Sequence, residues 1–247
     1  MNQRRPALQL YATAPYPCSY LPGQMARSQV VSPGELVSAP VYDQLIAQGF
    51  RRSGLFTYRP HCGHCQACQT LRIPVAQFRP NRSQRRTWQQ HRQLSVRVMP
   101  PLLQPAHFAL YRRYLQQRHS DGQMEHDSPA DYEQFLLRSH VHTRLLEFSS
   151  IDPAGQRPPQ LRMVSVVDLL GHGISAVYTF YDAASAKGLG TWAILWQIQW
   201  ARQLGLPYLY LGYWIAACPK MAYKARFVPH EVLVDGRWQR VEGPGKR

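Results

Sequence analysis

The sequence predicts a mixed α/β fold, and the last third of the chain provides the main observations. Two runs rich in apolar and β-branched residues, 161–169 and 174–181, flank a short glycine turn and indicate a strand hairpin. The segment Lys187-Gly188-Leu189-Gly190 then leads into a helix over 191–204, and an apolar strand follows over 207–213. A strand, a loop, a helix and a further strand in this order form a crossover unit, which indicates an α/β architecture.

Caps, turns and periodicity predict the remaining elements. The expected elements are a helix over 40–48, extended segments over 53–59 and 70–78, a helix over 105–117, a helix opened by the capping box Ser128-Pro129-Ala130-Asp131, a loop over 152–160, and a hairpin over 231–241 that turns at Asp235-Gly236. The double proline Pro100-Pro101 marks a boundary. We therefore expect an N-terminal cysteine- and arginine-rich region, 1–99, and a C-terminal domain, 100–247.

The charge of the chain points to a polyanionic partner. The 247 residues carry a net charge of +15, and between Asp43 and Asp121 there are 13 arginines with no lysine and no acidic residue. Guanidinium groups bind phosphate bidentately, and the aromatic residues interleaved with them are typical of RNA-binding surfaces. A solvated basic face is the alternative. The candidate RNA contacts are Arg79, Arg82, Arg85, Arg86 and Lys187.

The same sequence argues against a membrane or exported protein. No apolar stretch approaches the roughly 20 residues that a spanning helix needs. The start of the chain, Met1 to Pro6, is basic but has no apolar segment behind it, as a signal peptide would. Five cysteines, an odd number, do not suggest a disulfide framework. We expect a cytoplasmic protein with no membrane partner.

The order of elements in the C-terminal domain resembles the acyl-transferring half of a GNAT-type acetyltransferase. The helix after the glycine loop turns free N–H groups toward whatever lies in front of it, which suits a phosphate or a carboxylate. The usual acetyl-CoA signature is not clear, so this GNAT-like core leaves room for another acyl donor.

Several motifs along the chain together resemble one family. They are Cys18-Ser19-Tyr20-Leu21-Pro22-Gly23, Gly49-Phe50-Arg51-Arg52-Ser53-Gly54, the cysteine loop through Arg72-Ile73-Pro74, Arg82-Ser83-Gln84-Arg85-Arg86, the segment 175–182, Tyr210-Leu211-Gly212-Tyr213-Trp214-Ile215, and Lys220-Met221-Ala222-Tyr223-Lys224. In this order they resemble the bacterial branch of the aminoacyl-tRNA–protein transferases, the aspartate/glutamate leucyltransferases, which are related to eukaryotic arginyltransferases. The resemblance implies transfer of leucine from leucyl-tRNA to the α-amino group of proteins that begin with Asp or Glu, which marks them for degradation by the N-degron pathway.

That reaction needs little activation of either reactant by the enzyme, because the donor is an activated ester and the attacking amine has a pKa near 7.7–8.0. Positioning, stabilisation of the oxyanion and a mild base suffice, so no cofactor is required for the chemistry. The candidate catalytic residues on or beside the central strands are Asp168, Tyr178, Tyr181 and Asp182. The alternative is that the tyrosines are packing residues and that Asp182 caps the following loop.

An acidic acceptor side chain requires a cation in its pocket. Lysine is rare in this chain, which favours Lys220 and Lys224, four residues apart with Tyr223 between them. Arg52 and Arg226 are rival candidates. A solvated lysine pair is the alternative.

The cysteine loop suggests a structural metal site. Cys62, Cys65 and Cys68 follow a spacing that suits zinc or an iron–sulfur cluster. Cys18 lies in a second motif that matches the family and is the candidate fourth ligand, with His61 or His64 as replacements. In eukaryotic relatives the first motif carries a second cysteine where this chain has Leu21, so a metal-free group of thiols stays open. We expect Cys218 to be a small buried residue.

Three other functions remain open at this point. One is an arginyl-tRNA–protein transferase, which would use arginyl-tRNA as its donor. A non-catalytic, zinc-containing RNA-binding protein would explain the arginines and cysteines but not the crossover unit. A GNAT enzyme that uses acetyl-CoA would leave the arginines without a role.

Overall fold

The computed structural model of the chain describes residues 7–118, 127–152, 154, 156, 158–184 and 187–243. The start of the chain at 1–6 and part of the expected loop over 152–160, namely 153, 155 and 157, lie outside this description. No helix in the described parts of the chain is long and apolar enough to cross a membrane.

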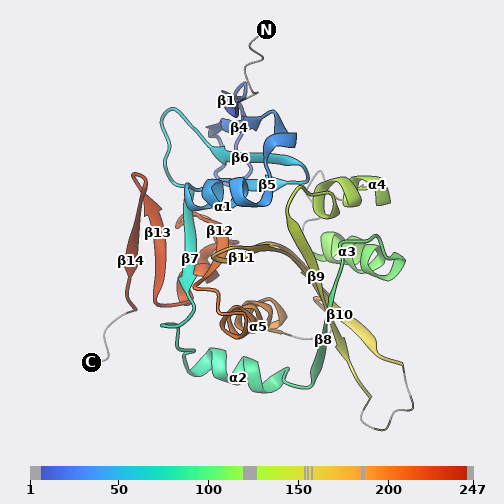
Figure 1. Cartoon of the computed structure of the whole chain (residues 1–247). Coiled ribbons are helices and arrows are strands. Elements are labelled where there is room, and N and C mark those ends of the chain that lie inside the picture. The colour runs from blue at the N-terminus through green and yellow to red at the C-terminus, as the bar shows by residue number, and fades with distance from the viewer. Residues whose placement is uncertain are drawn as a thin grey trace.

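A large sheet of eight strands organises the molecule, in the order β14-β13-β7-β12-β11-β10-β9-β8 (Figure 1). Its strands are β7 (Gln69–Pro74), β8 (Leu94–Met99), β9 (His142–Ser150), β10 (Gln160–Leu170), β11 (Gly173–Tyr181), β12 (Tyr208–Trp214), β13 (His230–Val234) and β14 (Arg237–Val241).

The N-terminal residues form two smaller sheets. A four-stranded sheet has the order β1-β4-β6-β5, and β2 pairs with β3. These strands are β1 (Gln9–Ala12), β2 (Tyr16–Pro17), β3 (Met25–Ala26), β4 (Ser28–Ser32), β5 (Arg51–Ser53) and β6 (Phe56–Pro60).

Five helices and three short helical turns complete the described structure. They are α1 (Ala39–Ala47), α2 (Arg82–Gln90), α3 (Pro105–Arg118), α4 (Pro129–Tyr132), α5 (Leu189–Gln203), η1 (Gly34–Leu36), the π-helical turn η3 (Glu133–Leu137) and η4 (Ala222–Arg226). The capping box expected at Ser128 is present, because its side chain accepts a hydrogen bond from the N–H of Asp131 and the Asp131 side chain accepts one from the N–H of Ser128.

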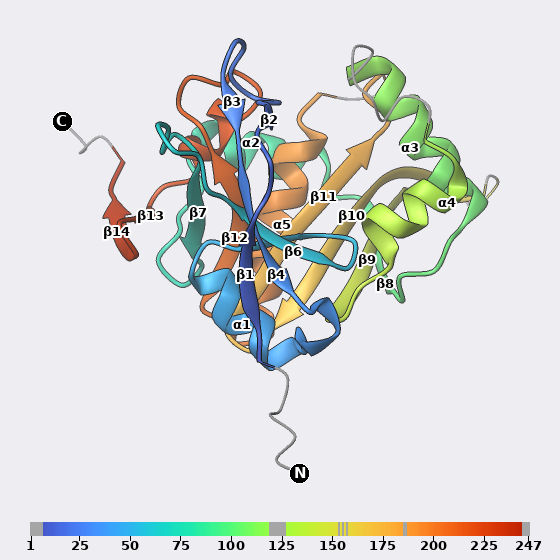
Figure 2. The same ribbon diagram turned by 90° about the horizontal axis from the view of Figure 1, so that it is seen from above.

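Helix α5 and the four-stranded sheet cover opposite faces of the large sheet. Helix α5 lies against one face with α2 beyond it, whereas α1 and the four-stranded sheet lie on the other face (Figures 1 and 2). The main core forms between α5 and the sheet, where Trp192 and Ile198 pack with Phe148 and Leu209. A second core lies where α3 and α4 cover β10 and β11.

The crossover unit expected from the sequence is confirmed. Strands β10 and β11 are antiparallel, α5 follows, and β12 runs parallel to β11. The pairing of β11 with β12 covers only Gly173 to Ser175 on β11 and Tyr208 to Tyr210 on β12. Beyond this point the two strands no longer pair, so the centre of the sheet opens.

The N-terminal region and the C-terminal domain share the large sheet. Strand β7 lies between β12 and β13, and β8 forms the edge beside β9. The expected boundary between 1–99 and 100–247 therefore does not coincide with a boundary between sheets.

Candidate active site between two separating strands

A cavity of about 160 Å³ lies where β11 and β12 separate. We call it the strand cleft. Its lining residues are Ser175, Ala176 and Val177 of β11, Leu211, Gly212 and Tyr213 of β12, and Tyr20, Tyr42, Arg51, Arg52, Tyr58, Met221 and Lys224 from surrounding segments.

Both strands are irregular at the cleft. The pairing of β11 with β10 skips Val177, and the pairing of β12 with β7 skips Leu211. Such bulges interrupt a ladder and re-aim backbone groups, and they are over-represented next to active sites. The strand cleft therefore offers backbone donors and acceptors that the sheet does not use.

Arg51 enters the cleft from β5 and is 7% exposed. Its Nη1 donates to Ser175 Oγ at 3.0 Å. Its Nη2 is buried and has no hydrogen-bond partner in the described part of the structure. Gly212 makes room for this guanidinium, because a Cβ at that position would lie 2.9 Å from Arg51 Nη2.

The neighbouring Arg52 is neutralised, in contrast to Arg51. Its Nε and Nη2 each donate to one carboxylate oxygen of Asp168 at 2.8 Å. Thr143 donates a further hydrogen bond to Asp168 Oδ1 at 2.7 Å. Asp168 is fully buried and does not line the strand cleft, so its position fits a group that orients Arg52 rather than one that touches a substrate.

Of the lysines that the structure describes, Lys224 is the one that lines the cleft. Its Nζ donates to the carbonyl oxygen of Tyr213 at 2.5 Å. Burial, together with the positive charge of Arg51, lowers the pKa of Lys224 to about 7. An amine with this pKa is partly neutral at physiological pH and can accept a proton.

The other expected acceptor-binding residues do not line the cleft. Lys220, Tyr223 and Arg226 are exposed, and none of the three lines the cleft.

Tyr178, Tyr181 and Asp182 also lie away from the strand cleft. Tyr178 packs edge-on against Phe135. Tyr181 packs against Tyr114, and the backbone N–H of Asp182 donates to the carbonyl of Arg162. The structure therefore does not group these three candidates with Asp168 in one site.

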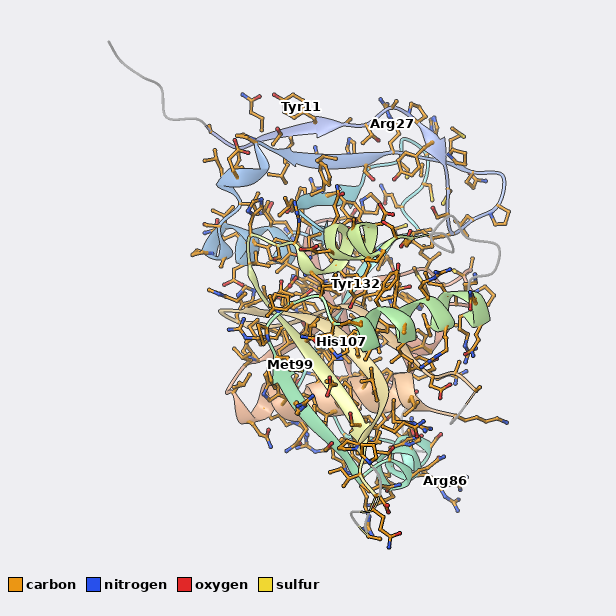
Figure 3. All side chains as sticks on the ribbon, turned by 90° about the vertical axis from the view of Figure 1, so that its right-hand side faces the viewer. Tyr11, Arg27, Arg86, Met99, His107 and Tyr132 are labelled. Carbon is orange, nitrogen blue, oxygen red and sulfur yellow. The ribbon has the colours of Figure 1, made fainter. Side chains whose placement is uncertain are left out.

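The basic residues expected to contact tRNA cluster around α2. Arg82, Arg85 and Arg86, which we call the α2 arginines, are exposed, as are Arg79 and Lys187. Figure 3 shows Arg86 at the end of the molecule opposite Tyr11 and Arg27.

Two contacts connect α2 to the rest of the site. His91, directly after α2, donates from Nε2 to the carbonyl of Lys187 at 2.9 Å, just before α5 begins. Gln84 Nε2 donates to the carbonyl of Arg226 at 3.1 Å, which joins α2 to the turn η4 that carries Lys224.

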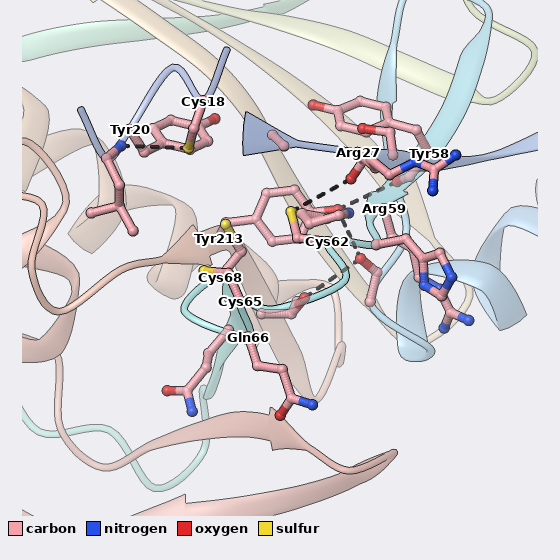
Figure 4. A pocket seen from close by; sticks show the side chains of 18 of the residues that line it. Cys18, Tyr20, Arg27, Tyr58, Arg59, Cys62, Cys65, Gln66, Cys68 and Tyr213 are labelled. Atoms are coloured by element: carbon pink, nitrogen blue, oxygen red, sulfur yellow. Dashed lines mark hydrogen bonds between the residues drawn. The ribbon is translucent and has the colours of Figure 1, made fainter. Parts of the chain in front are cut away.

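The four expected thiols, Cys18, Cys62, Cys65 and Cys68, line a second cavity of about 620 Å³ (Figure 4). We call it the cysteine cavity. Burial, followed by the neighbouring thiols, raises the pKa of Cys68 to about 12. Within the described residues, no three His, Cys, Asp or Glu side chains are grouped closely enough to hold a metal ion. The thiols thus share a cavity without forming a ligand set, and the metal stays a prediction.

The two cavities are neighbours. Tyr20, Tyr58 and Tyr213 line both of them. The hydroxyl of Tyr213 donates to the carbonyl of Gly49 at 3.0 Å, which fixes this shared wall. Cys218 is buried, as expected from the sequence.

Of the charged residues that line the strand cleft, Arg51 is the one that the sequence did not single out. The available signal was its place beside Arg52 in the matching segment 49–54. What distinguishes the two arginines is the carboxylate partner of Arg52, and that partner lies 116 residues away in the sequence.

Comparisons with known proteins identify the family of the chain. A family model described as "Arginine-tRNA-protein transferase, N terminus" matches residues 16–86, and its C-terminal counterpart matches residues 106–234. The crystal structure of FemX superposes with a TM-score of 0.50 at 11% identity, over 74% of this chain and 63% of the FemX chain, which indicates a shared fold.

Curated relatives match almost the entire chain. The aspartate/glutamate leucyltransferase of Polynucleobacter asymbioticus is 51% identical over 238 residues, which are 96% of each chain. The enzyme of the same name from Chromobacterium violaceum is 52% identical over 234 residues, which are 94% of each chain. The chain therefore belongs to the aminoacyl-tRNA–protein transferase family, in the branch of the aspartate/glutamate leucyltransferases, and it is an aminoacyltransferase.

Proposed function

We propose that this protein transfers leucine from leucyl-tRNA to the α-amino group of proteins that begin with Asp or Glu. The observation that carries the proposal is the strand cleft, where unpaired strand backbone meets Arg51 and Lys224. Relatives of about 50% identity that bear the name of this activity support it. The resulting N-terminal leucine would mark the acceptor for degradation by the N-degron pathway.

The reaction is the aminolysis of an ester. The α-amine nitrogen attacks the carbonyl carbon of the leucyl ester, a C–N bond forms, and the bond between that carbon and the terminal ribose oxygen of the tRNA breaks. The amine loses a proton, and the departing ribose oxygen gains one. The ester is already activated, so positioning and stabilisation of the negative oxygen in the tetrahedral intermediate supply most of the rate.

The residues of the strand cleft suit these steps. The backbone at the Val177 and Leu211 bulges can donate to the developing oxyanion, because neither residue has a ladder partner on the adjoining strand. Lys224 is the best candidate for the proton acceptor, since its amine reaches the cleft and is partly neutral near pH 7. We assign Asp168 a positioning role through Arg52.

The donor tRNA would lie on the side of α2 and α5. The α2 arginines, with Arg79 and Lys187, form an exposed basic surface that can bind phosphates. The contact between Gln84 and the carbonyl of Arg226 connects this surface to the turn that carries Lys224. A tRNA partner also favours a cytoplasmic location.

The decisive experiment supplies the purified protein with charged tRNA and a peptide beginning with Asp, and follows the peptide by mass spectrometry. We expect a mass increase of one leucine with leucyl-tRNA, and none with acetyl-CoA. Arginyl-tRNA is the necessary comparison, because the matching family models are described by an arginine donor. Addition of arginine but not leucine, or no addition from either tRNA, would contradict the proposal.

A further inference from the structure

Among the residues that the structure describes, three arginines are almost completely buried, and one of the three has no counter-ion. Arg52 pairs with Asp168 at 2.8 Å, and Arg72 pairs with Glu231 at 2.6 Å. Arg51 pairs with no carboxylate among the described residues, and its Nη1 donates to the neutral hydroxyl of Ser175. A buried charge is costly unless it is paired, so Arg51 needs an anion that the chain itself does not supply.

The free part of Arg51 lies in the strand cleft. The guanidinium reaches Ser175 on β11, and its Nη2 lies against Gly212 on β12, so it bridges the two strands where they separate. Nη2 is buried without a partner among the described residues. The position that an anion would take is therefore inside the cleft, beside Arg51.

The free guanidinium favours a carboxylate as that anion. The cleft, of about 160 Å³, has room for a side-chain carboxylate. The planar guanidinium fork matches a carboxylate in two parallel hydrogen bonds.

We propose that Arg51 binds the side-chain carboxylate of the acceptor's N-terminal Asp or Glu, and that this contact makes the protein selective for acidic acceptors. The inference rests on the proposed leucyl transfer and names the residue that selects its acceptor. Lys224 is the other cation of the cleft, but its amine is held by the carbonyl of Tyr213 and serves the α-amine instead.

The surroundings of Arg51 permit a test that needs no variant. The groups that face it or line the same cleft are Tyr42 of α1, Tyr58 of β6, Tyr210 and Tyr213 of β12, Tyr20, Lys224 of η4 and its neighbour Arg52. Burial raises the pKa of each of these five tyrosines, so they stay neutral up to pH 9. Lys224 is thus the group of this set that changes charge near neutral pH.

The measurement is kcat/KM for two peptides that differ only in an N-terminal Asp or Asn, at saturating leucyl-tRNA, from pH 6 to 8.5. A charged hydrogen bond contributes about 1.5–3 kcal/mol, so the Asp peptide should be favoured by about 10- to 150-fold. Because an arginine keeps its charge, this ratio should be constant across the pH range. A ratio that collapses as the pH rises through 7 would assign the selection to Lys224 and overturn the proposal.

Variants then identify the side chain whose charge selects the acidic acceptor. Arg51→Gln should bring the Asp/Asn ratio to within about threefold and leave leucyl-tRNA binding unchanged, whereas Arg51→Lys should keep part of the preference. Ser175→Ala removes only the hydrogen-bond acceptor of Arg51 Nη1, so it should give an intermediate Asp/Asn ratio. This milder variant keeps the test valid if Arg51→Gln fails to fold. Arg97→Gln is the matched control, because Arg97 is an exposed arginine on the edge strand β8 and should keep the full ratio.

The outcomes separate the two proposals. Leucine transfer with a full Asp preference in Arg51→Gln would overturn the role of Arg51 and leave the proposed function standing. If Arg51→Gln lowers kcat/KM equally for the Asp and Asn peptides, Arg51 acts on the leucyl ester, and its role in acceptor selection is overturned. If the wild-type protein transfers leucine to no peptide, both proposals fall.

Discussion

Replacing Asp168 by Asn should destabilise the protein strongly, because it removes the counter-ion of a buried arginine. The Arg52 and Asp168 side chains are 2% and 0% exposed, and two hydrogen bonds of 2.8 Å join them. The amide that replaces the carboxylate would keep the shape of the side chain, but it could accept only one of these bonds and would carry no charge.

Breaking one partner of a buried pair costs about 3–5 kcal/mol, because the other charge is left uncompensated. For a chain of this size, each kcal/mol lowers the thermal midpoint by about 2–4 °C. The Asp168→Asn variant should therefore melt roughly 6 to 20 °C below the wild type.

Urea unfolding followed by tryptophan fluorescence measures the free energy of unfolding directly. The double variant Arg52→Met with Asp168→Leu should recover much of the loss, because no unpaired charge remains, and the double-mutant cycle gives the coupling energy. Arg97→Ala provides the matched control, since Arg97 pairs with Glu147 at a side-chain exposure of 68% and should contribute less than about 1 kcal/mol.

One result would refute this reasoning. If Asp168→Asn costs no more stability than Arg97→Ala and yet abolishes leucine transfer, then Asp168 acts in the chemistry and not through the position of Arg52. The original expectation of a catalytic Asp168 would then be restored.

Three further predictions concern the charged surfaces and the thiols. Replacing the α2 arginines by Ala should weaken tRNA binding and reduce the slope of log K against log salt by about 2 to 3, and an unchanged slope would exclude these side chains as phosphate contacts. Lys224→Met should raise the free energy of unfolding most below pH 7, and this gain should shrink as the pH rises toward about 10.5. The reason is that the lysine amine binds its proton more tightly in the unfolded chain than in the folded one. Lys220→Met is the control, because Lys220 is exposed. Added zinc should protect the thiols of the cysteine cavity from alkylation and release protons, and thiols that react at the same rate with and without zinc would argue against the metal.

The sequence anticipates the crossover unit well, because its signals are local. The glycine turn before β11, the helix that ends at Gly205 and the apolar run of β12 each depend on neighbouring residues. The hairpin at Asp235-Gly236 is confirmed for the same reason, with both residues at positive φ.

Helix α2 was not anticipated, because its sequence has no apolar period. Of its residues, Trp88 alone is a large apolar side chain, and the helix begins with a capping box between Asn81 and Gln84. Its stability comes from contact with α5, where Trp88 stacks on Trp192. That contact joins segments about a hundred residues apart, which a reading of local pattern cannot show.

The site was anticipated only in part, for a similar reason. The choice of Lys224 over Lys220 depends on which of the two reaches the cleft, and both occupy comparable positions in the sequence. The difference between Arg51 and Arg52 depends on Asp168, and the burial of each arises from a sheet that the sequence did not place. Residue types were therefore predictable, whereas pairing and burial were not.

The position of β7 has a consequence for how the chain is made. Arg72 on β7 contacts Tyr210 and Glu231, which follow it by 138 and 159 residues. A ribosome that adds 5–20 residues per second reaches Tyr208 roughly 7 to 27 s after it has passed Pro74. Throughout that interval β7 has neither of its neighbouring strands, although its apolar side chains are already synthesised.

Strand β7 is therefore synthesised well before β12 and β13, the two strands that pair with it. The strand cleft is lined by residues of β12 and by Lys224, and β7, which pairs with β12, also pairs with β13, so the complete site forms only late in synthesis. A nascent chain released early would hold an apolar strand and a basic surface without a working site. A truncation before β13 should accordingly be recognised by its aggregation rather than by partial transfer activity.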